Sequence, residues 1–142
     1  MISKKGMTLV EVVIAMAIFG MIMVAVFPAF IVLNLTNVVS KENVTTNYMA
    51  QDVVEKIYNY SQSTNESDLI NTLITIDGFS LDTHNGNVYN LSKADDDYQT
   101  NLTVTFADPD TNFITVLVVV ESLNETISNQ MSQIETVVSF GA

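Results

Sequence analysis

Apolar residues fill the first quarter of the chain almost without interruption. From Val12 to Leu33 no charged side chain occurs. A helix over this segment would be about 33 Å long, because an α-helix rises 1.5 Å per residue, and this is enough to cross the hydrocarbon core of a bilayer. The pattern therefore predicts a membrane-spanning helix.

Downstream of this segment the apolar positions follow the period of an amphipathic helix. Between Asn47 and Ser61 they recur at spacings of three and four, at Met49, Val53, Ile57 and Tyr60, with Ala50, Val54 and Tyr58 widening the same face. Asp52 and Lys56 lie one turn apart on the polar side, where they can form an ion pair. Residues 34–46 are rich in Asn and Thr, which are weak helix formers. We still expect helix there, and a polar break at 61–67.

The remaining half of the chain alternates with a period of two, which is typical of strands. The expected strands are Leu73–Ile76, Leu102 to Phe106, an apolar and central strand from Phe113 to Val120, and Ile134 to Phe140. A hairpin is expected to turn at Asn85-Gly86 and lead into Val88-Tyr89. A turn is expected at Asp108-Pro109-Asp110 and a polar connection at 121–132. A long helix packed on a small antiparallel sheet is an α+β architecture.

Charge placement gives the apolar segment a direction. Lys4 and Lys5 precede it, and the next basic residue is Lys41. Because positive charge is retained on the cytoplasmic side, residues 1–6 are predicted inside and everything after Leu35 outside.

Glu11 is unexpected at the start of an apolar run. A charge near the centre of a membrane segment costs at least ~2.5–3.5 kcal/mol, and less near its edge. One interpretation is a helix-terminal carboxylate stabilised by the helix dipole. The other is a functional carboxylate whose positive partner comes from elsewhere.

The stretch Lys4-Lys5-Gly6-Met7-Thr8-Leu9-Val10-Glu11 resembles the class III leader of bacterial type IV pilins and pseudopilins. The resemblance implies that a prepilin peptidase cuts between Gly6 and Met7 and methylates the new amine of Met7. Glu11 is then the fifth residue of the mature chain and Pro28 the twenty-second, as in the family. Met7 stands where Phe is commoner, which resembles minor pilins and minor pseudopilins.

The residue types suit these implied roles. Gly6 has no side chain, so the backbone can enter a protease site closely. Glu11 could pair with the Met7 amine of its own chain or of a neighbour, and such a pair is strong where the dielectric constant is low. Pro28 and Gly20 should kink or loosen the helix, although membrane helices also tolerate both residues.

Two other interpretations of the N-terminus are less favoured. A secretory signal should end in a small-residue cleavage site, and the bulky Phe27 spoils the candidate at Ala25 to Ala29. A permanent anchor explains neither Glu11 nor Gly6-Met7. We therefore expect a leader at 1–6, a transmembrane and fibre-core helix at 7–35, and an extracytoplasmic globular domain at 36–142, helical to about 62 and then β-rich.

The resemblance implies a structural subunit rather than an enzyme. It would be a minor pilin or pseudopilin of a type IV pilus, a competence pilus or a type II secretion pseudopilus. The implied partners are the prepilin peptidase, the assembly machinery and sibling pilins that pack through their N-terminal helices. The subunit would sit in the cytoplasmic membrane before assembly and on the cell surface afterwards.

Composition narrows the remaining functions. The chain has 142 residues, a net charge of −11 and no Cys. Its acidity argues against direct nucleic-acid binding, and no cofactor or metal site is expected. His84 is predicted at the surface. Asp95-Asp96-Asp97 and the cluster Asp82, Asn85 and Asn87 lack the spacing of a calcium loop, so solvated turns are preferred. The alternative function is a membrane-tethered extracellular binding module whose acidic loops capture calcium or a ligand.

Overall fold

The computed structural model describes residues 7–107, 112–123 and 130–140. The chain divides into two compact units, Met1–Val38 and Val39–Ala142. Helix α1 (Leu9–Ser61) contributes residues to both units, so each unit is described by itself.

The first unit consists of the N-terminal half of α1. The helix continues through Gly20 and Pro28 without a break. Every described side chain before Val39 is exposed. Of the described helices, α1 alone is long and apolar enough to cross a membrane. Loosening of the helix at Pro28 stays a prediction.

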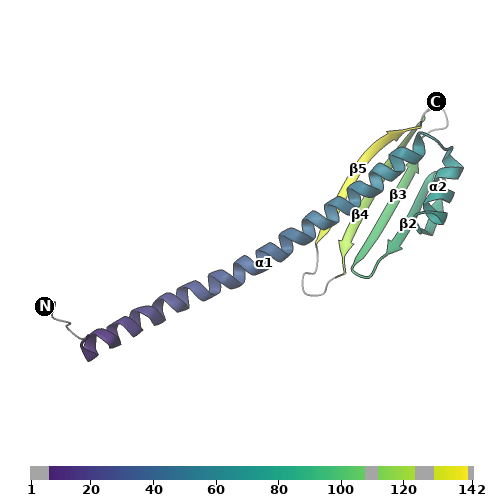
Figure 1. Ribbon diagram of the computed structural model, residues 1–142. Helices are drawn as coiled ribbons and strands as arrows, with labels where there is room; N and C mark the ends of the chain where they lie inside the picture. Colours follow the sequence, from purple (N-terminus) through teal and green to yellow (C-terminus); the bar gives the residue numbers. More distant parts are fainter. Residues whose placement is uncertain (1–6, 108–111, 124–129, 141–142) are drawn as a thin grey trace. The chain divides into compact units, whose positions relative to one another are not determined.

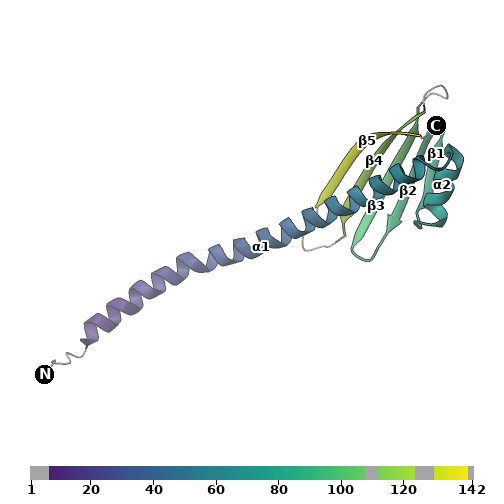
Figure 2. The same ribbon diagram turned by 45° about the horizontal axis from the view of Figure 1, so that its top comes forward.

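The second unit is built on a five-stranded antiparallel sheet in the order β1-β2-β3-β4-β5 (Figures 1 and 2). The strands are β1 (Ser80–Asn85), β2 (Val88–Ala94), β3 (Tyr98–Phe106), β4 (Phe113–Ser122) and β5 (Met131–Ser139). Every neighbouring pair is antiparallel. This confirms the α+β architecture that the sequence predicted.

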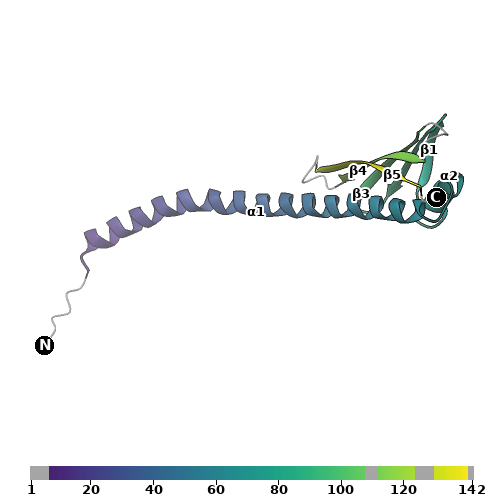
Figure 3. The same cartoon turned by 90° about the horizontal axis from the view of Figure 1, so that it is seen from above.

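The part of α1 from Val39 onward covers one face of this sheet (Figure 3). Ala50 and Ile57 are fully buried there. On the strands the buried apolar side chains alternate, as expected for a sheet with one covered face: Leu91, Leu102, Val104, Phe106, Ile114, Val116, Val118, Val120 and Val138. The core of the chain thus lies within the second unit.

After α1 and before β1, the chain forms a second helix, α2 (Glu66–Thr75). Leu69, Ile70 and Leu73 are buried on one side of it. The expected strand at Leu73–Ile76 was therefore wrong. The apolar residues there have helical spacing, and the run was too short to distinguish the two periods from a few residues.

The other strand predictions hold with small changes. The first hairpin turns at Gly86-Asn87, with Gly86 at φ +60. β4 is an interior strand, but the middle strand of the sheet is β3. The expected turn at 108–110 and most of the connection at 121–132 lie outside the described residues.

Candidate processing and assembly site

Helix α1 begins with two reciprocal hydrogen bonds. The Glu11 backbone N–H donates to Thr8 Oγ1 at 3.3 Å, and the Thr8 N–H donates to Glu11 Oε2 at 3.3 Å. This is a capping box, in which a Thr and a Glu three residues later satisfy backbone donors that have no partner inside the helix. The arrangement explains why the helix starts at Leu9.

The predicted site residues lie on either side of this cap. Met7 comes directly before it and is 74% exposed, whereas Lys4, Lys5 and Gly6 lie outside the described residues. Within the described part of the chain, the Glu11 carboxylate has no ion pair and accepts from the Thr8 N–H. Pairing of Glu11 with an amine stays a prediction.

The sequence prediction overlooked Thr8. Its signal was present, because Thr-x-x-Glu ahead of an apolar run is the capping-box pattern. The cap directs the Glu11 carboxylate toward the start of the helix. A cut after Gly6 would place a new ammonium group on Met7. This residue comes directly before Thr8, whose N–H already donates to the Glu11 carboxylate.

The apolar side chains around the first helical turns have no covering layer. Leu9 is 82% exposed and Met16 72%, and a shallow hollow is lined by Met7, Val12, Ala15, Met16 and Phe19. Continuous apolar surface of this extent marks contact with lipid or with another protein. The apolar side chains of the first unit therefore need a lipid or protein surface to cover them.

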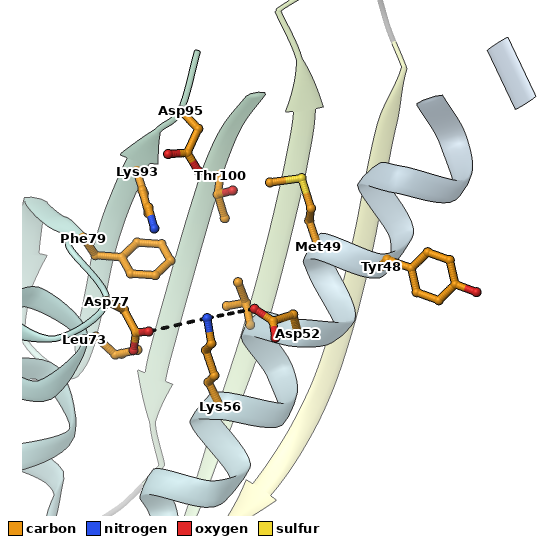
Figure 4. Close-up of a pocket in the computed structure, with 11 residues that line it drawn as sticks. Tyr48, Met49, Asp52, Lys56, Leu73, Asp77, Phe79, Lys93, Asp95 and Thr100 are labelled. Carbon is orange, nitrogen blue, oxygen red and sulfur yellow. Dashed lines mark ion pairs between the residues drawn. The ribbon is translucent and has the colours of Figure 1, made fainter. Parts of the chain in front are cut away.

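A second group of charged residues lines a cavity of about 310 Å³ in the second unit (Figure 4). Lys56 Nζ lies 2.8 Å from Asp52 Oδ2, which confirms the predicted pair, and 3.6 Å from Asp77 Oδ1. The hydrogen bond to Asp52 is the main reason why the pKa of Lys56 is raised. Asp77 Oδ2 is buried without a hydrogen-bond partner among the described residues.

In this cavity Lys56 is already held between two carboxylates. Outside the cavity lining, burial and then the nearby Asp77 raise the pKa of Tyr60. Within residues 7–107, 112–123 and 130–140, no three His, Cys, Asp or Glu side chains are placed to hold a metal ion. The geometry is that of an ion pair bridging α1 and the segment after α2.

Polar contacts also join α1 to β3, to β5 and to the residues beside them. The hydroxyls of Thr46 and Ser132 lie 2.8 Å apart and are buried, and Ser61 Oγ donates to the Ser139 carbonyl at 3.3 Å. Tyr98 donates to Glu42 Oε2 at 2.7 Å, and this bond raises the pKa of Tyr98. These contacts hold the second half of α1 on the sheet at several points.

Comparison with known proteins gives one finding, and it concerns the N-terminus. Residues 1–27 match a family described as the prokaryotic N-terminal methylation motif. The match includes Gly6, Met7, Thr8 and Glu11. No curated protein and no solved structure matches the chain.

Proposed function

We propose that this chain, a type IV pilin-like protein that carries the prokaryotic N-terminal methylation motif, is a minor pilin or minor pseudopilin. It would serve as a structural subunit of a type IV pilus, a competence pilus or a type II secretion pseudopilus. Its partners would be the prepilin peptidase, the assembly machinery and sibling subunits.

The observation that carries the proposal is the motif over residues 1–27. In this proposal Lys4 and Lys5 hold the leader in the cytoplasm, the peptidase cuts between Gly6 and Met7, and Met7 receives the methyl group. Residues 1–6 are then removed. Residues 7–35 anchor the subunit in the membrane, and residues 36–142 lie outside the cytoplasm.

Assembly would use the same helix that crosses the membrane. Its side chains are exposed along the whole first unit, so sibling helices could replace lipid around it without uncovering a core. Glu11 would meet the amine of a neighbouring subunit and set the axial position. Charge pairing would thus fix the register, while the apolar faces would supply most of the affinity.

Leader processing is the direct test. The mature protein, purified from its native membrane, should begin at Met7 with a methylated amine, as measured by intact mass and N-terminal sequencing. Gly6→Val should leave the leader uncut, because a branched side chain hinders entry of the backbone into a protease site. Gly20→Ala is a matched control, since an added Cβ meets nothing within 4 Å there.

A membrane-tethered binding module predicts a different result. It has no reason to be cut after Gly6, so a mature chain that still carries Lys4 and Lys5 would contradict the subunit proposal. A chain that begins after Ala25 would instead indicate a secretory signal.

A further inference from the structure

Edge strand β5 directs half of its backbone groups away from the sheet. At its two ends, the Gln130 carbonyl accepts from the Ser122 N–H at 3.0 Å, and the Phe140 N–H donates to the Asn112 carbonyl at 2.8 Å. In an antiparallel pair, alternate residues bond to the neighbouring strand, and the β4–β5 register has no shift. The residues whose N–H and C=O groups point outward are therefore Met131, Gln133, Glu135, Val137 and Ser139.

Most of these outward groups have no partner within the described part of the chain. The Ser139 carbonyl is the exception, because Ser61 and Gln62 donate to it. The other four residues present a row of free donors and acceptors. Such a row is a template for pairing with another extended chain.

The opposite edge of the sheet is protected in a way that β5 is not. β1 has six residues, and its register shifts between Leu81 and Thr83. A bulge of this kind twists an edge away from further pairing. β5 has nine residues in unbroken register, and it contains neither Pro nor Lys.

A hollow of about 310 Å³ runs beside the open edge, between β5 and α1. It is lined by Gln51, Val54, Glu55, Tyr58, Ile134, Thr136, Val137 and Val138. On the α1 side of this hollow, Tyr58 is 52% exposed. A strand added to β5 would place every second side chain over this apolar hollow.

We propose that β5 is a strand-addition site for an extended segment of a different, basic subunit. The segment would pair with the outward backbone groups of β5, bury an apolar side chain in the hollow, and present Lys or Arg to Glu55 and Glu135. This inference rests on the proposed function, because sibling subunits are the expected source of the segment.

Charge decides against a second copy of this chain as the occupant. The chain carries −11 and has no Arg. The one Lys on its strands, Lys93 on β2, lines the cavity beside Lys56. A second copy would bring acidic residues to an edge already flanked by Glu55 and Glu135.

The test uses the absence of Cys from the full chain. Gln133→Cys places a thiol on β5, and Thr83→Cys places a control thiol on β1. Both are alkylated with a membrane-impermeant maleimide, first on intact cells and then on the purified full chain in detergent. Cys at 133 should react about tenfold slower in cells, the value for a site covered nine-tenths of the time. Cys at 83 should react equally in both.

A second pair of variants separates strand addition from contact of another kind. Val137→Pro removes an N–H that points away from β4, so it should abolish the protection at 133 and leave the fold intact. Val137→Thr retains the N–H and should leave the protection unchanged. Equal reactivity at 133 in cells and in detergent, or protection that survives Val137→Pro, overturns the inference. Disulfide-linked homodimers through position 133 would identify a second copy and overturn it as well.

Failure of this inference can be distinguished from failure of the proposed function. The mature N-terminus and the presence of the chain in sheared fibres are measured on the same cells. A chain that is never processed or found in fibres, but is protected at 133, retains the strand-addition site and loses the fibre role. A processed fibre subunit that reacts freely at 133 retains the fibre role and loses the strand-addition site.

Discussion

The Glu11 carboxylate has one role within the chain, as a helix cap, and a second, proposed role between subunits, as the partner of an amine. In the single chain it caps α1 through Thr8 at 3.3 Å, an exposed contact at the long end of hydrogen-bond distances. Losing a cap of this kind costs ~0.5–2 kcal/mol, which is minor for a helix of 53 residues. A large effect of replacing Glu11 would therefore have to arise between subunits.

Glu11→Gln tests this distinction, because Gln can still complete a capping box and only the charge is lost. Cleavage and membrane insertion should persist. The ratio of the protein in sheared fibres to that in membranes should fall more than tenfold, because a buried ion pair that loses one partner costs ~3–5 kcal/mol.

Thr8→Ala is the matched control for the Gln variant. It removes the hydroxyl cap and keeps the charge, so its fibre-to-membrane ratio should stay near that of the wild type. Equal ratios for the wild type and Glu11→Gln would leave Glu11 as a helix-terminal carboxylate alone.

At the scale of elements, the sequence predicted what depends on local period. The apolar helix, the alternating strands and the Asp52–Lys56 pair were all visible in one pass along the chain. Contacts between distant segments were not. Thr46 and Ser61 are buried on α1 although they are polar, because Ser132 and Ser139 supply partners far along the chain.

Contacts between distant segments also explain where the sequence predictions were wrong. Tyr58 was placed on the buried face by its spacing, yet it is 52% exposed, because it lies beside the open edge of β5, where the sheet ends. At the candidate processing site, Gly6 and Met7 came from a resemblance over a short motif, whereas Glu11 was also singled out by its charge at the start of an apolar run. Thr8 could have come from physics alone, because its capping role is local.

The buried contact between the Thr46 and Ser132 hydroxyls predicts that mutating the two residues lowers the free energy of unfolding by different amounts. Thr46 also donates to the Asn43 carbonyl at 3.1 Å, so Ser132 must be the donor between the two hydroxyls. Thr46→Val leaves the Ser132 donor buried without an acceptor and should lower the free energy of unfolding by ~1–3 kcal/mol. Ser132→Ala leaves the Thr46 donor satisfied and should cost roughly 0.5–1.5 kcal/mol.

Urea unfolding of the full chain in detergent would measure both mutants and the double mutant. Thr46→Val with Ser132→Ala should cost less than the sum of the single changes, because no donor is left buried alone. An additive double mutant would show that the two hydroxyls do not interact in solution.

At the scale of the whole molecule, the buried core belongs to one unit only. Its members all lie between Ala50 and Val138, whereas the described residues before Val39 bury nothing. A chain that begins at Asn34 should therefore be soluble and folded. Circular dichroism should show both helix and sheet without added metal, with a cooperative thermal transition.

Two results would contradict this expectation. An insoluble fragment would mean that the membrane half supports the fold. Loss of structure on addition of a chelator would favour the calcium-dependent binding module over the pilin-like subunit.

The contacts between α1 and β5 also determine how the second unit responds to a pulling force. From Thr46 to Ser61 the helix rises about 22 Å, and from Ser132 to Ser139 the strand extends about 23 Å in the same chain direction. The two polar anchors therefore hold segments of matching length. Tension along the helix axis strains both anchors and the apolar contacts between them simultaneously, as shear. The globular part accordingly yields as one unit, at a higher force than contacts that rupture one after another.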